Sequence, residues 1–230
     1  MSDPANPSGA LPGDPRHGLS DAALARYYAT KSPSWMVLAR LGPEGGPRRV
    51  AALDPHLAYL RARRDAIRFA GPIFADDNVT ATGSLTLIDA PDRAAVEAYI
   101  AAEPYNVNGA FDRVEIMRWS SSMALRQLDY PRTPGWAQFL ITAIDHANGP
   151  ARRAAVNDAH HTFQATVMDR YIARGPLLAD DGVRIIGSLM IVEFPDRAAF
   201  DLFWAAEPLN VGRVFERVTI DSWQFGKAIG

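Results

Sequence analysis

The sequence predicts an α+β fold in which two ferredoxin-like βαββαβ units pack sheet to sheet as an intramolecular dimeric α/β barrel. The chain has 230 residues, and residues 35–119 align without a gap with residues 139–223, a constant shift of 104 positions. Roughly 33 of the 85 aligned pairs are identical, far more than chance gives. Each copy also shows the same order of strand-like and helix-like segments. A unit of about 90 residues is too long for a solenoid repeat and suits a small domain.

The first strand and first helix of each copy come from its opening segments. Apolar runs rich in strand-forming residues predict strand one at residues 35–41 and 139–144. Asp54 and Asp158 have the character of helix N-caps, and the helix is expected over the segments that follow, residues 56–70 and 160–174. Gly71 and Gly175 are expected to end this helix, because glycine readily adopts the left-handed backbone found there.

The remaining segments complete the unit. A repeated phrase, GPIFADD in the first copy and GPLLADD in the second, supplies strand two. A turn and strand three follow, and then a second helix with apolar residues at helical spacing, which Asp92 and Asp196 are expected to cap. Strand four alternates between polar and apolar residues. These elements are expected at residues 71–77, 78–89, 93–103 and 111–119, and at residues 175–181, 182–193, 197–207 and 215–223.

The order βαββαβ leaves one sheet face of each unit to be buried, and a second unit in the same chain can cover it. We therefore expect a flexible leader at residues 1–33, a first domain at residues 34–121, a linker at residues 122–137 and a second domain at residues 138–230. A homodimer of the tandem chain is left open as a further assembly.

Composition excludes several classes of function. Hydrophobic residues make up 48% of the chain and the net charge is −2, so no basic surface for nucleic acid or an anionic membrane is expected. The chain has no cysteine, which excludes disulfides and thiolate nucleophiles and mildly favours a reducing compartment. No long apolar stretch predicts a membrane span, and the Pro- and Gly-rich N-terminus does not resemble a secretory signal. We therefore expect a cytoplasmic protein with a flexible N-terminal leader.

The topology brings candidate proton-transfer groups to one end of each unit. There the start of the first helix, the end of the second strand and the end of the second helix meet. The candidate catalytic residues at this end are His56, Asp77 and Glu103 in the first copy, and His160, Asp181 and Glu207 in the second. A histidine in a first helical turn is biased toward the neutral form that a general base needs. The alternatives stay open that the histidines pack or cap, that the aspartates only form turns and that the glutamates cap the turn after the helix.

Four arginines are candidates for substrate binding. Arg49 and Arg153 precede the expected helix and could hold an anionic substrate, or could be solvated charges. Arg113 and Arg217 lie on strand four and face either the sheet interior or the helices. No paired metal-ligand spacing, phosphate-binding glycine loop or nucleophile elbow is present, so we expect no metal and no cofactor, and a small molecule as the partner.

These residues together resemble the YciI-like (YCII-related) family of dimeric α/β-barrel proteins. The resemblance rests on the RR pair, DPHLAYL, GPIFADD, TGSLTLID, the AAEPY turn and FDRVEIMRW, and it covers about 85 residues twice. It implies an enzyme with a His/Asp-centred site, and similar proteins include a dehydrochlorinase of chlorinated-aromatic breakdown and, by fold, muconolactone isomerase. The family histidine corresponds to His56 and His160, the preceding basic residue to Arg49 and Arg153, and the acid after Gly-Pro to Asp77 and Asp181.

The chain departs from the family pattern at several positions. The usual Asp-Pro after the second helix is Glu103-Pro104 and Glu207-Pro208, and an arginine that often precedes the histidine is Leu53 and Asn157. The second copy also has polar or smaller residues where the first has Leu57, Leu60 and Arg61, namely His161, Gln164 and Ala165. The two sites therefore need not be equally active.

Three functional hypotheses follow. The first is a cofactor-free lyase or isomerase in which a histidine moves a proton on an enol, lactone or phenolic substrate derived from an aromatic compound. The second is a noncatalytic or stress-associated barrel that binds a small ligand. The third is a fusion in which one copy has become a scaffold for the other.

Overall fold

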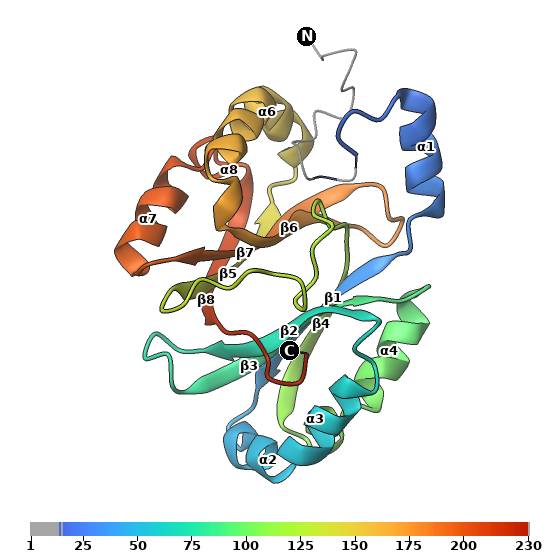
Figure 1. The fold of residues 1–230 in the computed structure, drawn as a ribbon, viewed down its shortest axis with the longest axis vertical. Helices are drawn as coiled ribbons and strands as arrows, with labels where there is room; N and C mark the ends of the chain where they lie inside the picture. Colours follow the sequence, from blue (N-terminus) through green and yellow to red (C-terminus); the bar gives the residue numbers. More distant parts are fainter. Residues whose placement is uncertain (1–13, 15, 230) are drawn as a thin grey trace.

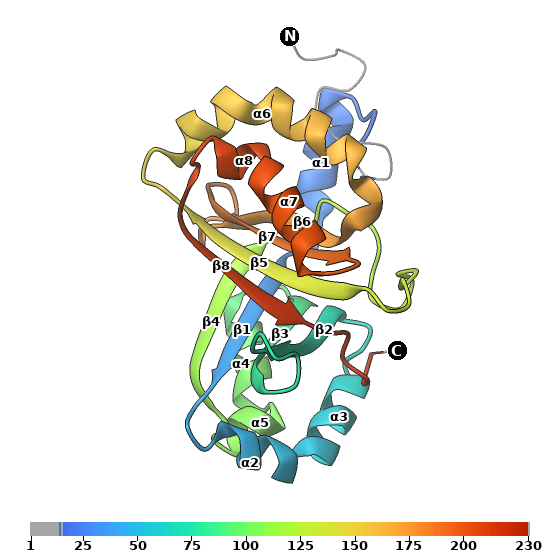
Figure 2. The same ribbon diagram turned by 90° about the vertical axis from the view of Figure 1, so that its left-hand side faces the viewer.

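The computed structural model describes residue 14 and residues 16–229. Two βαββαβ units close into one eight-stranded barrel with the strand order β1-β3-β2-β8-β5-β7-β6-β4, and the helices lie outside it (Figures 1 and 2). All strand pairs are antiparallel. The predicted fold class, two ferredoxin-like units packed sheet to sheet, is confirmed.

The first unit consists of β1 (Ser34–Leu41), α2 (Gly45–Ala51), α3 (Leu53–Arg61), β2 (Ile67–Phe74), β3 (Ala81–Asp89), α4 (Arg93–Ala101), α5 (Pro104–Val107) and β4 (Phe111–Trp119). The second consists of β5 (Ala137–Asp145), α6 (Gly149–Thr166), the 3-10 turn η1 (Met168–Arg170), β6 (Tyr171–Leu178), β7 (Ile185–Phe194), α7 (Arg197–Ala206), α8 (Pro208–Val211) and β8 (Phe215–Trp223). A further helix, α1 (Asp21–Thr30), lies within the expected leader, so that part is helical; residues 1–13 of the leader lie outside the described residues.

The first helix of each unit differs from the prediction at both ends. Helical backbone begins at Gly45 and Gly149, eleven residues before the expected starts, because the Ala- and Arg-rich segments there favour a helix, and in the first unit it is divided into α2 and α3. Asp54 lies in the first turn of α3 without capping it, and Asp158 lies inside α6. Gly71 and Gly175 are not helix ends. They lie within β2 and β6, whose β-branched and aromatic residues make a strand where a helix was expected.

Asp92 and Asp196 cap the second helices as predicted, since their carboxylates accept from the backbone N–H groups of Ala95 and Ala199 at 2.8 Å. Strands three and four also lie where the sequence places them, within a few residues.

The three largest clusters of the core lie in different layers of the structure. Inside the barrel, apolar residues of both units form one cluster, which includes Met36, Leu85, Leu140 and Leu189. Between each sheet and its helices lies a separate cluster, around Val96 in the first unit and around Phe200 in the second. The alternation along the strands therefore separates a shared interior from two outer layers.

The two units are joined where the fourth strand of each unit pairs with the second strand of the other unit. Trp223 pairs with Ile73, and Trp119 pairs with Leu177. The segment after β8 continues along β2, where the Gly226 N–H donates to the Ala70 carbonyl at 2.8 Å. The segment after β4 repeats this on β6, where the Ser122 N–H donates to the Arg174 carbonyl at 2.8 Å.

Gly71 and Gly175 lie at these crossings. A Cβ at Gly71 would lie 1.9 Å from the Gln224 carbonyl oxygen, and one at Gly175 would lie 2.0 Å from that of Ser120. The glycines of the repeated phrase are therefore needed for the close approach of the other unit. Among the described residues, no helix combines the length and apolar character of a membrane span.

Candidate active site

The centre of each unit's site is a histidine paired with a buried glutamate. His56 Nδ1 lies 2.5 Å from Glu103 Oε1, and His160 Nδ1 lies 2.6 Å from Glu207 Oε1. Glu103 is 3% exposed and Glu207 is fully buried. The convergence of histidine and glutamate expected from the topology is therefore present in both copies.

The glutamates are held in place by a second contact. Each is the N-cap of the short helix that follows, since Glu103 Oε2 accepts from the Asn106 N–H at 3.1 Å and Glu207 Oε2 accepts from the Asn210 N–H at 3.0 Å. A carboxylate at the start of a helix is stabilised by the free N–H groups and the dipole there. Each glutamate therefore both caps a helix and contacts a histidine.

This arrangement determines which histidine nitrogen can act on a ligand. A carboxylate that accepts from Nδ1–H fixes the tautomer and leaves the lone pair on Nε2, the nitrogen on the opposite side of the ring. The first-turn position expected for both histidines holds only for His56, which is in the first turn of α3; His160 lies deep within α6. Orientation by a buried carboxylate, rather than the helix dipole, is therefore the feature that the two histidines share.

Asp77 and Asp181 lie away from the histidines. They are exposed residues of the turns after β2 and β6, and each accepts hydrogen bonds from two backbone N–H groups of its own turn at 2.8–2.9 Å. The bonds to Thr80 and Val79 lower the pKa of Asp77, and those to Val183 and Arg184 lower the pKa of Asp181. Neither aspartate lines a pocket that contains a histidine, so the expected convergence with His56 and His160 does not occur.

A cavity of about 330 Å³ lies beside His56. The imidazole stacks on Tyr105 with ring centroids 3.7 Å apart, and the Arg49 guanidinium lies 5.3 Å from the same ring. The Tyr105 hydroxyl and Arg49 Nη1 are both buried without a hydrogen-bond partner among the described residues. Burial raises the pKa of Tyr105, and the nearby Arg49 cation offsets part of this effect. The cavity thus has, beside the histidine, a cation without a carboxylate partner among the described residues.

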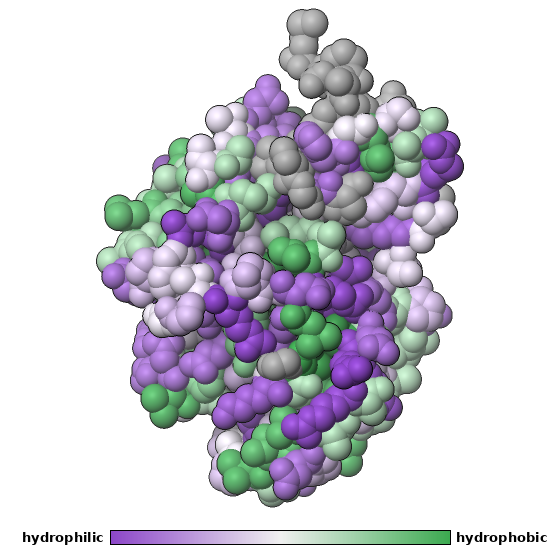
Figure 3. All heavy atoms as spheres, viewed as in Figure 1, coloured by the Kyte–Doolittle hydropathy of each residue, from purple (hydrophilic) through white to green (hydrophobic). Residues whose placement is uncertain are grey.

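The rest of this cavity, which we call the first pocket, is mainly apolar. Its wall includes Leu53, Leu57 and Leu60 of α3. It is closed by residues 224–228, which follow the last strand of the other unit. On the face shown in Figure 3, apolar residues gather beside the C-terminal end of the chain, with hydrophilic residues around them.

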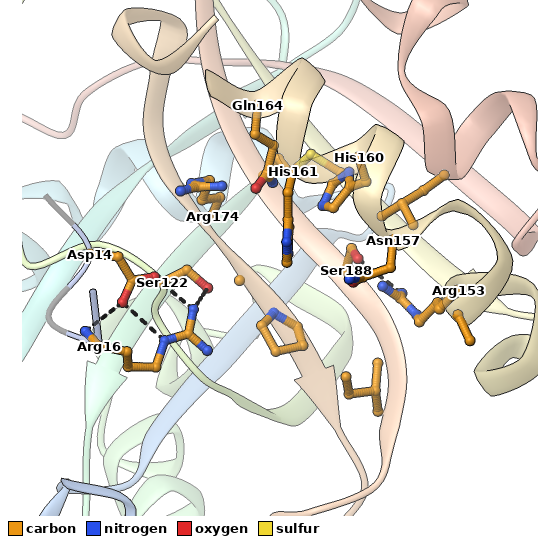
Figure 4. A pocket seen from close by; sticks show the side chains of 16 residues that line it. Asp14, Arg16, Ser122, Arg153, Asn157, His160, His161, Gln164, Arg174 and Ser188 are labelled. Carbon is orange, nitrogen blue, oxygen red and sulfur yellow. Dashed lines mark hydrogen bonds and ion pairs between the residues drawn. The ribbon is translucent and has the colours of Figure 1, made fainter. Parts of the chain in front are cut away.

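An equivalent cavity of about 240 Å³, the second pocket, lies beside His160 (Figure 4). Eleven of its lining positions correspond to lining positions of the first pocket at the shift of the internal repeat. It is closed by Ser122, which follows β4 of the first unit, and by Asp14 and Arg16. Each pocket is therefore completed by the segment after the fourth strand of the other unit.

The two pockets differ in the state of their repeated arginine. Arg153 makes a bidentate ion pair with Asp145 at 2.7 Å and donates to the Ser188 hydroxyl at 3.0 Å. The residue equivalent to Asp145 in the first unit is Leu41, so Arg49 has no such carboxylate. Arg49 is consequently available to an anionic ligand, whereas the charge of Arg153 is already balanced.

Arg113 and Arg217 belong to a different region. They line a cavity of about 320 Å³ at one end of the barrel interior, together with the ion pair between Arg40 and Asp221. Arg113 pairs with Glu115 at 2.8 Å. The structure therefore separates these two arginines from both histidines. In the part of the chain that it describes, no three His, Asp or Glu side chains gather in a way that could hold a metal ion.

Comparison with known proteins identifies the family. A model of the YCII-related domain matches residues 34–120 and again residues 137–224. The chain belongs to the YCII-related domain family. Its two family domains are the two copies of the internal duplication. A search of curated proteins found no match.

Solved structures show the fold of this YCII-related chain in other proteins. A mutant chlorite dismutase from Candidatus Nitrospira defluvii is 10% identical, with a TM-score of 0.60 over 88% of this chain and 95% of that chain. A haem-binding protein from Thermus thermophilus is 11% identical, with a TM-score of 0.54 over 86% and 93%. At these identities the likeness is one of fold. A 5-chloro-2-hydroxyhydroquinone dehydrochlorinase from Burkholderia phenoliruptrix is 24% identical over 38% of this chain and 93% of that chain, with a TM-score of 0.35.

Proposed function

We propose that the chain is a small-molecule enzyme of the lyase or isomerase type, in which His56 acts as a general base in the first pocket. The observation that carries this proposal is the buried contact between His56 Nδ1 and Glu103, at 2.5 Å, beside a cavity that also holds Arg49. A base oriented by a carboxylate and a cation without a carboxylate partner are the two groups that proton abstraction next to a carbonyl requires.

The chemistry needs only these side chains. His56 Nε2 takes a proton from carbon, and the electron pair of the C–H bond moves toward the carbonyl oxygen. The Arg49 guanidinium stabilises the negative charge that develops on this oxygen. In an isomerisation the proton returns to another carbon, and in an elimination a leaving group departs with its electron pair. Both routes regenerate the neutral histidine once the proton has been passed on.

The walls of the first pocket suggest the class of substrate. Leucine side chains and the Tyr105 ring favour a flat, mainly apolar molecule, and the space of about 330 Å³ is of the size of small-ligand sites. A substrate that combines a ring with one oxygen able to carry negative charge fits both features. We therefore propose enol, lactone or phenolic compounds derived from aromatic rings as substrates.

The proposal is tested by turnover of a panel of enol-lactones and halogenated hydroquinones, followed by absorbance. His56→Ala is expected to lower kcat by about 100-fold or more without a matching loss of thermal stability. Glu103→Gln is expected to lower kcat with a smaller change in KM, because the carboxylate acts through the histidine. His160→Ala is the matched control in the second pocket and is expected to retain most of the activity.

Full turnover by the His56→Ala, His160→Ala double variant would overturn the proposal. Saturable binding of these compounds by the wild-type chain with no turnover would favour the alternative function, a noncatalytic barrel that holds a small ligand. The leucine-lined wall of the first pocket is the feature that favours this alternative.

A further inference from the structure

The second pocket contains a buried arginine that the first pocket lacks. Arg174 is 4% exposed, and its equivalent in the first unit is Ala70. Its Nε is buried without a hydrogen-bond partner among the described residues, and its Nη2 donates to the Met168 sulfur at 3.8 Å. Its guanidinium also lies 5.1 Å from the Tyr171 ring. Leaving a cation buried with such weak partners is costly, and burial lowers the pKa of Arg174.

The two other arginines that line this pocket each pair with a carboxylate. Arg16 binds Asp14 at 2.6 Å, Arg153 binds Asp145, and the carboxylate of Glu207 faces His160. No ion pair is formed by Arg174 with any described residue. Among the described arginines that line this pocket, Arg174 is therefore the one with no carboxylate within ion-pair distance, at a position where the first pocket has a methyl group.

The residues around Arg174 have changed in the same direction. Leu57 and Leu60 of the first pocket are replaced by His161 and Gln164, and Leu53 is replaced by Asn157. Figure 4 shows Gln164 and His161 next to Arg174 on one side of the pocket, with Asn157 and Ser188 on the other side. The substitutions replace an apolar wall by donors and acceptors of hydrogen bonds.

From these features we infer that the second pocket binds a small polar monoanion, a hydroxy or oxo carboxylate, whose carboxylate pairs with Arg174. A single guanidinium without a carboxylate partner matches one carboxylate in charge and in geometry. The amide and imidazole groups match the hydroxyl or carbonyl oxygen of such a ligand. A cavity of about 240 Å³ is smaller than the usual sites of drug-sized molecules and suits a ligand of this size. The two copies thus hold chemically different ligands, and this site does not depend on catalysis by His56.

The test is calorimetric titration of the full chain with L-lactate, with L-lactamide as the neutral counterpart of the same shape. L-lactate is expected to bind at one site and L-lactamide more weakly by about tenfold or more. Arg174→Met removes the charge and keeps an apolar side chain of similar length, and it is expected to weaken L-lactate binding about 10- to 100-fold. Arg184→Met, at an exposed arginine of the turn between β6 and β7, is the matched control and should bind like the wild type.

Two further variants distinguish a loss of binding from a loss of folding. Arg174→Ala installs the residue that the first unit already tolerates, and Arg174→Lys should retain part of the binding. The inference is overturned if L-lactate does not bind the wild-type chain, if it binds the Arg174→Met variant equally well, or if Arg49→Met rather than Arg174→Met abolishes binding. Activity of the His56→Ala variant plays no part in these outcomes.

Discussion

Replacing Gly71 by alanine tests how the two units complete each other. The added Cβ would lie 1.9 Å from the carbonyl oxygen of Gln224 and 2.8 Å from the Trp223 ring. Since an ordinary contact begins at about 3.4 Å, the segment after β8 must withdraw by roughly 1.5 Å. This segment cannot withdraw freely, because its Gln224 and Gly226 N–H groups donate to the carbonyls of Pro72 and Ala70.

The magnitude follows from these contacts. Overpacking of a well-packed crossing costs about 1–3 kcal/mol, and weakening two backbone hydrogen bonds adds about 0.5–1.5 kcal/mol for each. We expect Gly71→Ala to lower the free energy of unfolding by about 2–6 kcal/mol. At about 2–4 °C per kcal/mol for a chain of this size, Tm falls by roughly 4–24 °C. Gly175→Ala should act similarly, because its Cβ would lie 2.0 Å from the Ser120 carbonyl oxygen.

The assay is thermal unfolding followed by circular dichroism, with Gly46→Ala as the matched control. Gly46 lies in α2 with nothing within 4 Å of an added Cβ, and alanine there should raise stability by about 0.5–1 kcal/mol. A Gly71→Ala variant with Tm within about 1 °C of the wild type would refute the reasoning. Because residues 224–228 close the first pocket, this variant should also weaken ligand binding there more than in the second pocket.

Three further predictions concern single side chains. Asp77→Asn and Asp181→Asn should leave kcat for any confirmed substrate within about twofold of the wild type, because both aspartates accept hydrogen bonds only from their own turns. A loss of kcat in steady-state kinetics as large as that of His56→Ala would contradict this. Tyr105→Leu introduces the residue that the second copy has at this position and removes the ring that stacks on His56. It should raise the KM of ring substrates by about 5- to 15-fold, and an unchanged KM would contradict this. Burial lowers the pKa of Lys31 from 10.5 to about 8, so between these values the unfolded chain holds a proton that the folded chain has lost, and stability rises with pH. Urea denaturation between about pH 8 and 9.5 should show this rise in the wild type, and Lys31→Met should abolish it.

The repeat allowed most of the fold to be predicted, but it could not show where each first helix begins and ends. Both copies carry Asp54 or Asp158 before an apolar helical pattern, and both carry Gly-Pro after it, so the duplication repeated a misleading local signal. Tertiary context decides against it. The residues before Gly71 are needed as a strand that pairs with β3 and reaches β8, and this pairing outweighs their helical periodicity.

The same limit applies to the site. The pairing of His56 with Glu103 follows from topology, because it only requires that a first helix and the end of a second helix share one end of the unit. The roles of Arg49 and Arg153 do not follow from local pattern. Eight residues before Arg153 the first strand of the second unit ends at Asp145, which pairs with it, whereas the equivalent residue before Arg49 is Leu41. The sequence does not show that this strand end lies against the helix, so the pairing could be recognised only in the structure.

Reciprocal closure of the pockets gives a physical reason for joining two copies in one chain. The first pocket needs residues 224–228 of the second unit, and the second pocket needs Ser122 from beyond the first unit, so neither unit alone encloses its cavity. In a dimer of identical chains, every substitution would appear in both pockets at once. A tandem chain removes this constraint, because Ala70 and Arg174 can differ while the backbone bonds at both positions stay the same. If the fusion has this consequence, exchanging the two residues as Ala70→Arg and Arg174→Ala should move carboxylate binding from the second pocket to the first, with the fold unchanged.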